Sequence, residues 1–338
     1  MHEISAMITP TGELFMPPDV DEARAFFRQK SRAMTDKRMS PAEAVKQFIQ
    51  NGDYIATGGF GSVRFSTAIL HEIVRTHKHN LGLSGHCTTH DFQILAAGQA
   101  IDRCDVAYVI GLEMRAYSPN ARRFMESGQV RVTEWSNAGL GWRYKAAAMG
   151  IPFLPARTML GSDTLRYSAA KMIEDPFSGQ KLVAVPALYP DVGILHVHQA
   201  DIYGNAQIEG VSIVDLDLAR ASKRVILTTE RIVDTEEFRK EPGKTSIPYY
   251  LTDAVCLVPY GSYPGDMPFE YFSDEAHLAE WVEAERDAET FQVFLDKYIY
   301  GTNSFTEYLE LIGGEKRLAE LRELAPLKRK HESRHGRD

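Results

Sequence analysis

Short apolar runs alternate with helix-like segments between residues 54 and 150, and this alternation restricts the fold more than any other feature of the sequence. The strand-like runs are "YIATGG" (54–59), "LGLSG" (81–85), "DVAYVIG" (105–111) and "VRVTEW" (130–135). Each is followed by a segment with helical periodicity, and strands separated by helical patterns of about 10–15 residues are typical of parallel βαβ units. The sequence therefore predicts an α/β protein with an open, mainly parallel sheet and flanking helices.

The second half adds four continuous apolar runs, each bounded by turn signals: "KLVAVP" (181–186), "VGILHVHQA" (192–200), "RVILTTERIV" (224–233) and "AVCLVPYG" (254–261). Such runs are typical of strands that are buried on both faces of a sheet. From about residue 274 the pattern becomes helical. Because no internal repeat and no low-complexity linker is present, one large α/β domain with a helical C-terminal segment is predicted for residues 39–325.

The two ends of the chain differ from this domain in pattern. Residues 1–38 read as an N-terminal extension with one helix in "DEARAFFRQKSRAM" (21–34), and residues 326–338 form a basic C-terminal tail. The domain itself is predicted to begin with a helix in which Ser40 is the N-cap, Pro41 is the first helical residue and Glu43 completes a capping box.

Charge and cysteine content limit the classes of partner. The net charge of -8 disfavours a nucleic-acid partner over most of the surface. The three cysteines, Cys87, Cys104 and Cys256, form no CxxC pair, so neither a disulfide framework nor a zinc site is predicted and a reducing cytoplasm is expected. No secretory signal is recognised, and no apolar stretch reaches the ~18 residues of a membrane helix.

The stretch "TGGFGSVRFS" (57–66) is the strongest local signal for a binding site. Gly58, Gly59 and Gly61 lie between a predicted strand and a predicted helix, where backbone N–H groups can hold an anion. It is neither a dinucleotide fingerprint, because the third glycine of GxGxxG is missing, nor a P-loop, because no GK[ST] follows. Glycines at such a turn can also be purely structural.

The stretch "SGHCTTHD" (84–91) also follows a short strand and precedes a helix. Because ligands of open α/β sheets bind outside the carboxyl ends of the strands, both loops are expected at one edge. Thr88 or Thr89 could equally serve as a plain N-cap. His196 and His198 stand two residues apart on one strand face, but no third ligand is placed by the sequence, so no metal is predicted.

Several segments resemble the family I CoA-transferases. "KLVAVPALYPDVGILHVHQADIYGNAQIEG" (181–210) is similar to the family stretch that ends in A-D-x-x-G-N-x-x-I-x-G. "GDYIATGGFGS" (52–62), "ARRFMESGQV" (121–130) and "AAAMGIPFLPARTMLGSD" (146–163) match further family segments in the same order. The resemblance covers about residues 40–315, and the A subunits of glutaconate CoA-transferases are the nearest by pattern.

This resemblance implies a function and a division of labour. Such enzymes move coenzyme A between an acyl-CoA and a free carboxylate through an acyl-glutamyl anhydride and a glutamyl-CoA thioester. In two-subunit members the glutamate belongs to the B subunit, in a Ser-Glu-Asn-Gly-like context that does not occur here. The chain is thus expected to be inactive without a B-type partner in a hetero-oligomer and to need no cofactor, with Glu113 as the weaker candidate within the chain.

The same resemblance implies the residues that bind the acyl-CoA and the carboxylate. Backbone N–H groups of the glycine loop are expected to face the thioester oxyanion, so that Gly59→Val would remove activity with little loss of folding. The turn at Asp201, Gly204 and Asn205 is expected to be mainly architectural. The full set of predicted binding residues is Gly58, Gly59, Phe60, Gly61, Ser84, Gly85, His86, Thr88, Gln199 and Asn205.

Two other functions are compatible with the sequence. Hydrolases on the same fold open steroid-derived rings of CoA-linked intermediates, but they carry an acid in the segment that matches "TEWSNAG" (133–139), where this chain has Asn137. An amide cannot act as a general base, so this difference favours a transferase. The absence of an in-chain nucleophile also permits a non-catalytic acyl-CoA-binding subunit.

Overall fold

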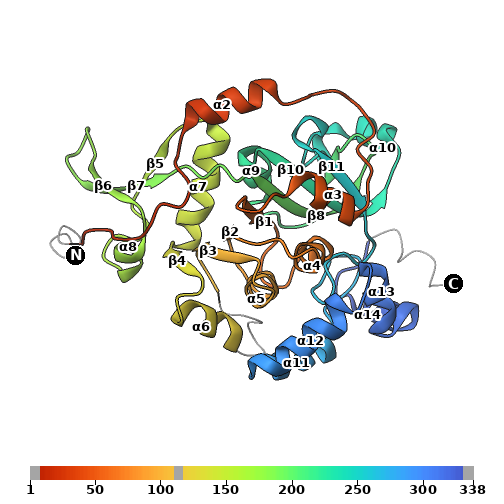
Figure 1. Cartoon of the computed structure of the whole chain (residues 1–338). Helices are drawn as coiled ribbons and strands as arrows, with labels where there is room; N and C mark the ends of the chain where they lie inside the picture. Colours follow the sequence, from red (N-terminus) through yellow and green to blue (C-terminus); the bar gives the residue numbers. More distant parts are fainter. Residues whose placement is uncertain (1–7, 110–116, 330–338) are drawn as a thin grey trace.

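The computed structural model describes residues 8–109 and 117–329, and its centre is an eight-stranded sheet (Figure 1). Seven strands follow the order β11-β10-β8-β1-β2-β3-β4 and pair in parallel, and the short β9 pairs antiparallel with β8. This confirms the predicted fold class. The strands are β1 (Tyr54–Thr57), β2 (Leu81–Gly85), β3 (Ile101–Val106), β4 (Arg131–Glu134), β8 (Val192–Ala200), β9 (Ala206–Gln207), β10 (Arg224–Ile232) and β11 (Ala254–Leu257).

Both faces of this sheet are buried, as the continuous apolar runs predict. Successive side chains of a strand point to opposite faces, and in β8 Ile194 packs into one hydrophobic cluster while Leu195 and Val197 pack into the other. Ile226 and Leu227 of β10 divide in the same way. Parallel sheets need such a cover on each side because their strands are apolar on both faces.

Helices on both faces of the main sheet supply this cover. One face carries α3 (Pro41–Phe48), α4 (Thr67–Arg75), α5 (His90–Ala97) and α6 (Pro119–Glu126), and the other carries α7 (Asn137–Met149) and α9 (Asp215–Ala221). The capping box is present in α3, where the Ser40 hydroxyl accepts from the Glu43 N–H and the Glu43 carboxylate accepts from the Ser40 N–H at 2.8 Å. The remaining helices are α8 (Asp163–Tyr167), α10 (Thr235–Lys240), η1 (Pro242–Lys244) and η2 (Tyr249–Leu251).

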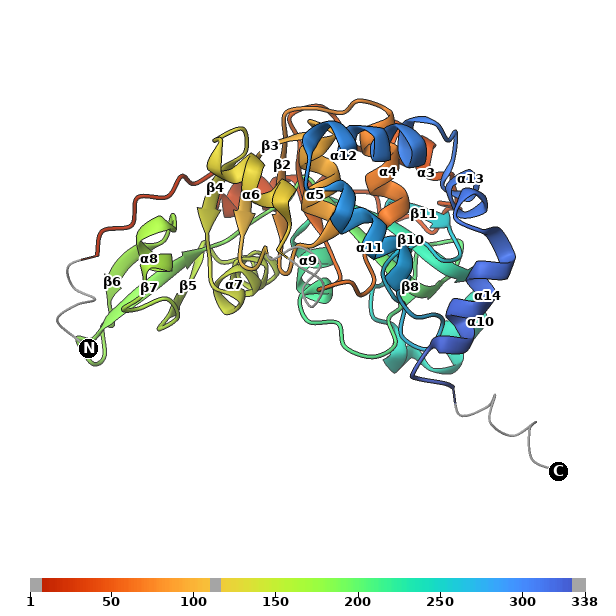
Figure 2. The same ribbon diagram turned by 90° about the horizontal axis from the view of Figure 1, so that it is seen from below.

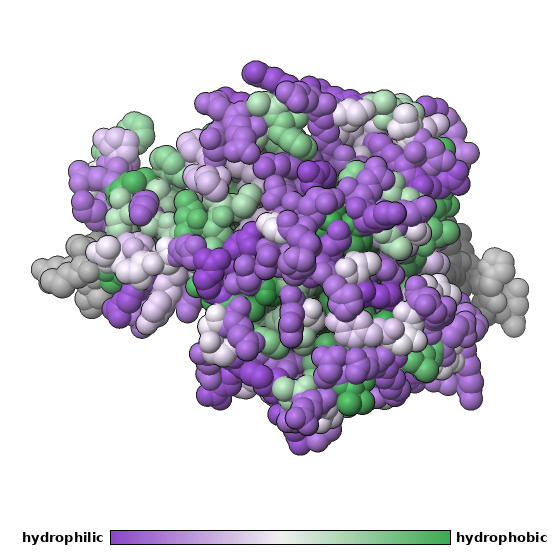
Figure 3. All heavy atoms as spheres, viewed as in Figure 1, coloured by the Kyte–Doolittle hydropathy of each residue, from purple (hydrophilic) through white to green (hydrophobic). Residues whose placement is uncertain are grey.

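The run at residues 181–186 does not join the main sheet, which corrects the expectation that it is a central buried strand. It forms β7 (Lys181–Pro186) of a separate antiparallel sheet, between β5 (Phe153–Ala156) and β6 (Lys171–Glu174). This small sheet projects from the main body in Figures 1 and 2. Hydrophobic surface is visible on the same side of the molecule in Figure 3. Phe153 of β5 and Phe177, between β6 and β7, are both exposed.

The N-terminal extension packs against the main sheet. Its helix, α2 (Val20–Gln29), begins at the N-cap Asp19 and is shorter than the predicted range. Beyond it, the Lys30 Nζ lies 2.7 Å from the Asp253 carboxylate and also donates to two backbone carbonyls. Lys37 then forms a backbone hydrogen bond with Val255, the second residue of β11. Residues 20–38 are thus attached to the edge strand rather than separate from it.

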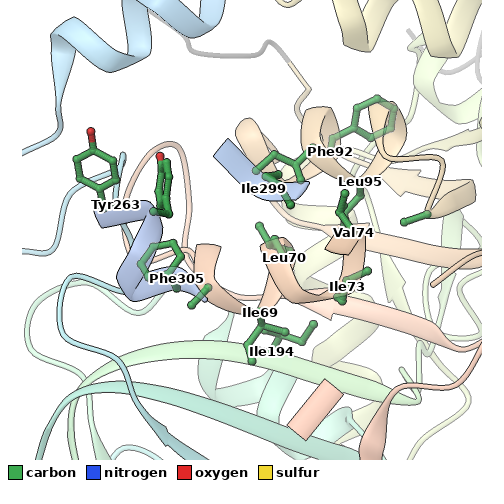
Figure 4. Close-up of a cluster of buried hydrophobic side chains, with 14 of the residues drawn as sticks. Ile69, Leu70, Ile73, Val74, Phe92, Leu95, Ile194, Tyr263, Ile299 and Phe305 are labelled. Carbon is green, nitrogen blue, oxygen red and sulfur yellow. The ribbon is translucent and has the colours of Figure 1, made fainter. Parts of the chain in front are cut away.

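The C-terminal helices complete the core on the α4–α5 side. They are α11 (Glu275–Ala284), α12 (Ala288–Leu295), η3 (Asp296–Tyr300), α13 (Phe305–Leu311) and α14 (Gly314–Leu324). Figure 2 shows α11 and α12 beside α4 and α5, and Figure 4 shows Ile299 and Phe305 directed toward Leu70 and its neighbours in α4. In the part of the chain that the structure describes, no helix combines the length and apolarity needed to cross a bilayer.

Candidate functional site

The order of the strands places the ligand-binding edge. From β1 the chain adds β2, β3 and β4 on one side, whereas from β8 it adds β10 and β11 on the other. The direction of winding therefore reverses between β1 and β8, and in open α/β sheets ligands bind in the crevice outside the carboxyl ends of the strands at this point. The glycine loop (58–64) follows β1 directly, so the structure brings it to the edge where a ligand is expected.

Most N–H groups of the glycine loop already donate hydrogen bonds within the protein. The Gly58 N–H donates to the Ile194 carbonyl at 2.9 Å, and the Gly59 N–H donates to Asp215 Oδ1 at 2.7 Å. The Phe60 N–H donates to the Val63 carbonyl at 3.1 Å. The expectation that these three amides face the thioester is therefore wrong.

Two amides of the loop remain as donors to a ligand. Among the residues that the structure describes, the N–H groups of Gly61 and Ser62 make no hydrogen bond. They are consecutive in a loop in which Gly61 has a φ of +57°. Consecutive backbone N–H groups in a turn with a left-handed residue form a concave site for an anion. The oxyanion donors, if this loop supplies them, are Gly61 and Ser62.

A buried ion pair holds this loop against α9, and the sequence contains no local signal for it. Arg64 is fully buried at a φ of +62°, and its Nη2 lies 2.7 Å from Asp215 Oδ2 and 2.7 Å from the Val211 carbonyl. Asp215 uses its other oxygen for Gly59. Within the described residues, Arg64 Nε and Nη1 have no hydrogen-bond partner. Two nitrogens of this buried guanidinium, with three N–H groups between them, therefore have no acceptor among the described residues.

The loop of residues 84–89 is hydrogen-bonded to the glycine loop. More of its side chains already have hydrogen-bond partners within the protein than the sequence predicts. The Thr89 hydroxyl donates to the Gly61 carbonyl at 2.6 Å, which fixes the two loops relative to each other. Ser84 pairs with the Tyr144 hydroxyl at 2.7 Å, and Thr88 donates to the Tyr108 carbonyl at 3.1 Å. A hydroxyl has one proton to donate, so Thr88, one of the predicted binding residues, already uses its proton within the protein.

His86 is a predicted binding residue with a buried polar side-chain atom that has no partner among the described residues. It is largely buried, and its Nδ1 has no hydrogen-bond partner in the described residues. Burial lowers the pKa of His86 below its usual value. A backbone hydrogen bond to Asn137 and the charge of Asp215 act in the opposite direction but are outweighed by burial. The imidazole is therefore neutral at pH 7 and can accept or donate one hydrogen bond.

A buried carboxyl group lies under both loops. Asp91, at the start of α5, accepts from the Thr57 hydroxyl at 2.8 Å and from the Thr89 N–H at 2.8 Å. Burial raises the pKa of Asp91 to about 6, although these hydrogen bonds lower it. Gly85 packs closely here, because a Cβ atom at that position would lie 2.2 Å from Thr88 Cγ2. Asp91 and Gly85 therefore shape the floor of the loops.

The turn after β8 is architectural, as the sequence predicts. Asp201 Oδ1 accepts from the N–H groups of Tyr203 at 3.0 Å and Asn205 at 2.9 Å, while Gly204 has a φ of +95°. The Asn205 side chain donates to Asp201 Oδ2 at 2.7 Å and accepts from a backbone N–H, so it anchors the turn. Gln199 is half-buried and donates to Gln207 Oε1 at 2.8 Å.

The remaining candidates do not add a metal or a nucleophile to the described site. Glu113 lies outside the described residues. His196 is bonded at both ring nitrogens, to Thr228 and Glu230 at 2.8 and 2.7 Å. His198 is bonded to the Pro268 carbonyl and the Glu209 N–H. In residues 8–109 and 117–329 no three His, Cys, Asp or Glu side chains are grouped to hold a metal ion.

A model of the Coenzyme A transferase family matches residues 38–257, and the chain belongs to that family. It is 30% identical to the A subunit of glutaconate CoA-transferase from Acidaminococcus fermentans, over 83% of this chain and 93% of the relative. It is 33% identical to the A subunit of 3-oxoadipate CoA-transferase from Pseudomonas knackmussii, over 79% of this chain and 94% of the relative. The crystal structure of the Acidaminococcus enzyme superposes with a TM-score of 0.81 and covers 84% of this chain and 95% of its own.

Relatives with other activities share the fold. The cholesterol ring-cleaving hydrolase IpdA subunit of Rhodococcus jostii is 27% identical over 79% of this chain and 93% of the relative. The decarboxylase AibA/AibB structure superposes with a TM-score of 0.69 at 32% identity, covering 78% of this chain and 100% of that one. Family membership by itself therefore does not decide between CoA transfer, hydrolysis and decarboxylation.

Proposed function

We propose that the chain is the A subunit of a heteromeric acyl-CoA:carboxylate CoA-transferase that acts on a dicarboxylic acyl group. The similarity to the A subunits of two CoA-transferases, together with the position of the glycine loop at the point where the winding of the sheet reverses, carries this proposal. Both of those enzymes are named for a dicarboxylic acid. Asn137, at the first position of α7, argues against the hydrolase because an amide cannot take up a proton from water.

In this proposal a glutamate of a B-type partner is the nucleophile. Its carboxylate attacks the thioester carbonyl, an acyl-glutamyl anhydride forms and CoA thiolate leaves. The thiolate then attacks the glutamyl carbonyl, giving a glutamyl-CoA thioester and the free acid. The second acid reverses these steps and accepts CoA. The covalent route divides one difficult exchange into easier steps and needs no cofactor beyond the CoA substrate.

This chain would stabilise the charge that develops on the thioester oxygen. The N–H groups of Gly61 and Ser62 are the available donors on the glycine loop. Removing one oxyanion donor typically costs a factor of about 10²–10³ in turnover. The neutral imidazole of His86 would provide a further hydrogen bond to the acyl group or the acid. The buried pair of Arg64 and Asp215 would keep the loop in position.

Reconstitution tests the proposal. The purified chain, its B-type partner and the complex are each assayed with a dicarboxylic acyl-CoA and labelled free acid. We expect exchange only in the complex, and sodium borohydride after incubation with acyl-CoA should reduce a thioester on a partner glutamate. Exchange by the isolated chain would refute the division of labour.

The other activities of the family give different products in the same assay. Loss of thioester without an acceptor acid would identify a hydrolase, and release of CO₂ from the acyl group would identify a decarboxylase. Tight binding of acyl-CoA with no turnover of any kind would identify a non-catalytic binding subunit. Each of these results would replace the proposed function.

A further inference from the structure

A cavity opens at the carboxyl end of β10, and none of its lining residues belongs to β1 or β8. Its volume is about 560 Å³, and its lining includes Glu230 and Arg231 of β10 and Tyr260 from the segment after β11. Glu270 and the arginines Arg322 and Arg329 complete its polar wall. Four of these six residues lie beyond residue 257, where the match to the family model ends. The C-terminal part of this chain therefore builds most of the cavity.

The acidic residues of this cavity already have partners. Glu230 accepts from His196 Nε2 at 2.7 Å, from the Tyr271 hydroxyl at 3.0 Å and from the Tyr260 N–H at 2.7 Å. Glu270 accepts from both Arg231 and Arg329 through one oxygen, Oε1. All three contacts of Glu230 are made within the protein, whereas Glu270 Oε2 accepts no hydrogen bond among the described residues.

The guanidinium groups, in contrast, have donors left over. Each guanidinium carries five N–H donors in a planar fork. Arg231 uses Nη1 for Glu270, and Arg329 uses Nε and Nη2 for Glu209 and Glu270, with the Glu209 contacts at 3.3 and 3.2 Å. Three arginines and two glutamates line the cavity, and Glu209, which pairs with Arg329 at 3.2 Å and with Arg231 at 3.8 Å, brings the formal charge of the group to zero.

Arg322 is the arginine with the most freedom to bind a ligand. It lies on α14 with its guanidinium carbon 5.4 Å from the centre of the Tyr260 ring, and its Nη2 donates to the Tyr260 hydroxyl. No carboxylate of the described residues forms an ion pair with it. The ring and its hydroxyl together restrict the orientation of the guanidinium, and its remaining N–H groups are available to an oxyanion.

We propose that this cavity is a binding site for a small molecule that carries a carboxylate or phosphate group. The oxyanion would lie between Arg322 and those N–H groups of Arg231 and Arg329 that do not bond a glutamate, and the rest of the molecule would lie along Tyr260. None of the residues that line the cavity belongs to the glycine loop, so its ligand is proposed apart from the transferase reaction. Its ligand would be held by a charge-assisted hydrogen-bond network rather than by a single exposed lysine or arginine.

Calorimetric titration of the full-length chain tests this site. Inorganic phosphate, pyrophosphate and citrate are the probes, each at an ionic strength held constant with sodium chloride so that screening does not change. We expect saturable binding of at least one probe. A preference for phosphate and pyrophosphate would identify a phosphate ligand, and a preference for citrate would identify a carboxylate ligand.

Variants locate the site. Arg322→Gln should raise the dissociation constant of the preferred probe by about tenfold or more, and Arg322→Lys should give an intermediate value because an ammonium group cannot bind in a bidentate manner. Arg286→Gln is the control, because Arg286 is an exposed arginine of the segment after α11 that pairs with Glu283 at 3.0 Å outside the cavity. No saturable binding by the wild-type chain, or equal binding by Arg322→Gln, would overturn the proposal. Equal loss in Arg286→Gln would overturn it as well, since binding would then be non-specific.

Discussion

A methyl group at Gly59 provides a quantitative test of the glycine loop. Gly59 has a φ of +84°, and a Cβ atom there would lie 2.4 Å from the Val63 carbonyl oxygen. Gly52 is a matched control, because its φ is +90° but an added Cβ would meet nothing within 4 Å. Gly52→Ala therefore introduces backbone strain alone, and Gly59→Ala introduces the same strain together with a steric clash against backbone.

The structure gives the expected size of each effect. A left-handed conformation costs a non-glycine residue about 1–2 kcal/mol, so Gly52→Ala should lower the free energy of unfolding by about that amount. In Gly59→Ala the loop must also move, which strains the paired hydrogen bonds between Phe60 and Val63 at 3.1 and 2.8 Å. At about 1 kcal/mol for each hydrogen bond, the total loss should be about 3–4 kcal/mol.

Urea denaturation followed by tryptophan fluorescence measures both losses, and the m-value shows whether the unfolding remains two-state. Equal losses for the two variants would refute the reasoning, because the clash would then cost nothing. The sequence alone predicts a different result, in which a side chain at Gly59 blocks the substrate and has little effect on folding. The structure predicts instead that a side chain at Gly59 lowers the free energy of unfolding, and that this loss precedes any effect on activity.

Two further predictions concern buried charges. Asp215→Asn leaves Arg64 buried without its counter-charge, so the free energy of unfolding should fall by about 3 kcal/mol or more in urea denaturation. Asp217→Asn is the control, because Asp217 lies on the same helix and forms ion pairs at 3.4 and 3.6 Å with more exposed partners. Its free energy of unfolding should fall by less than about 1 kcal/mol. Equal losses in the two variants would contradict the account. Burial raises the pKa of Glu285 to about 7, against hydrogen bonds from Ser118 and Trp281 that lower it. Because the folded state then binds the proton more tightly than the unfolded state, this group's contribution to stability is present below about pH 4.5 and is lost as the pH rises to about 7, by about 3 kcal/mol. Glu285→Gln should remove that slope, and an unchanged slope of unfolding free energy against pH would show that Glu285 does not cause it.

The fold can be predicted from the sequence because the signals are local. The helix cap at Ser40 and the alternation of strands and helices depend on residues close together in the chain. The run at residues 181–186 is misplaced by sequence reasoning because a six-residue apolar segment looks the same in a central parallel strand and in a small antiparallel sheet. Its pairing with β5 and β6 depends on tertiary contacts that no spacing in the sequence reveals.

The candidate site can be predicted in position but not in detail. Glycines after a predicted strand indicate the loop, and the order of the strands then fixes its place at the sheet edge. The hydrogen bond from Gly59 to Asp215 joins residues 156 positions apart, so the sequence cannot show that this amide is already used. A separation of 151 positions likewise conceals the ion pair between Arg64 and the same Asp215.

The packing of the C-terminal helices on α4 and α5 has a consequence for synthesis of the chain on the ribosome. Leu70 and Ile73 of α4 are translated more than 200 residues before Ile299 and Phe305, which lie beside α4 in the folded protein. At about 5–20 residues per second, this apolar face remains without its cover for roughly ten to fifty seconds. During that interval the nascent chain presents a surface suited to chaperones and prone to aggregation. The match to the family model ends at residue 257, before the helices that complete this core.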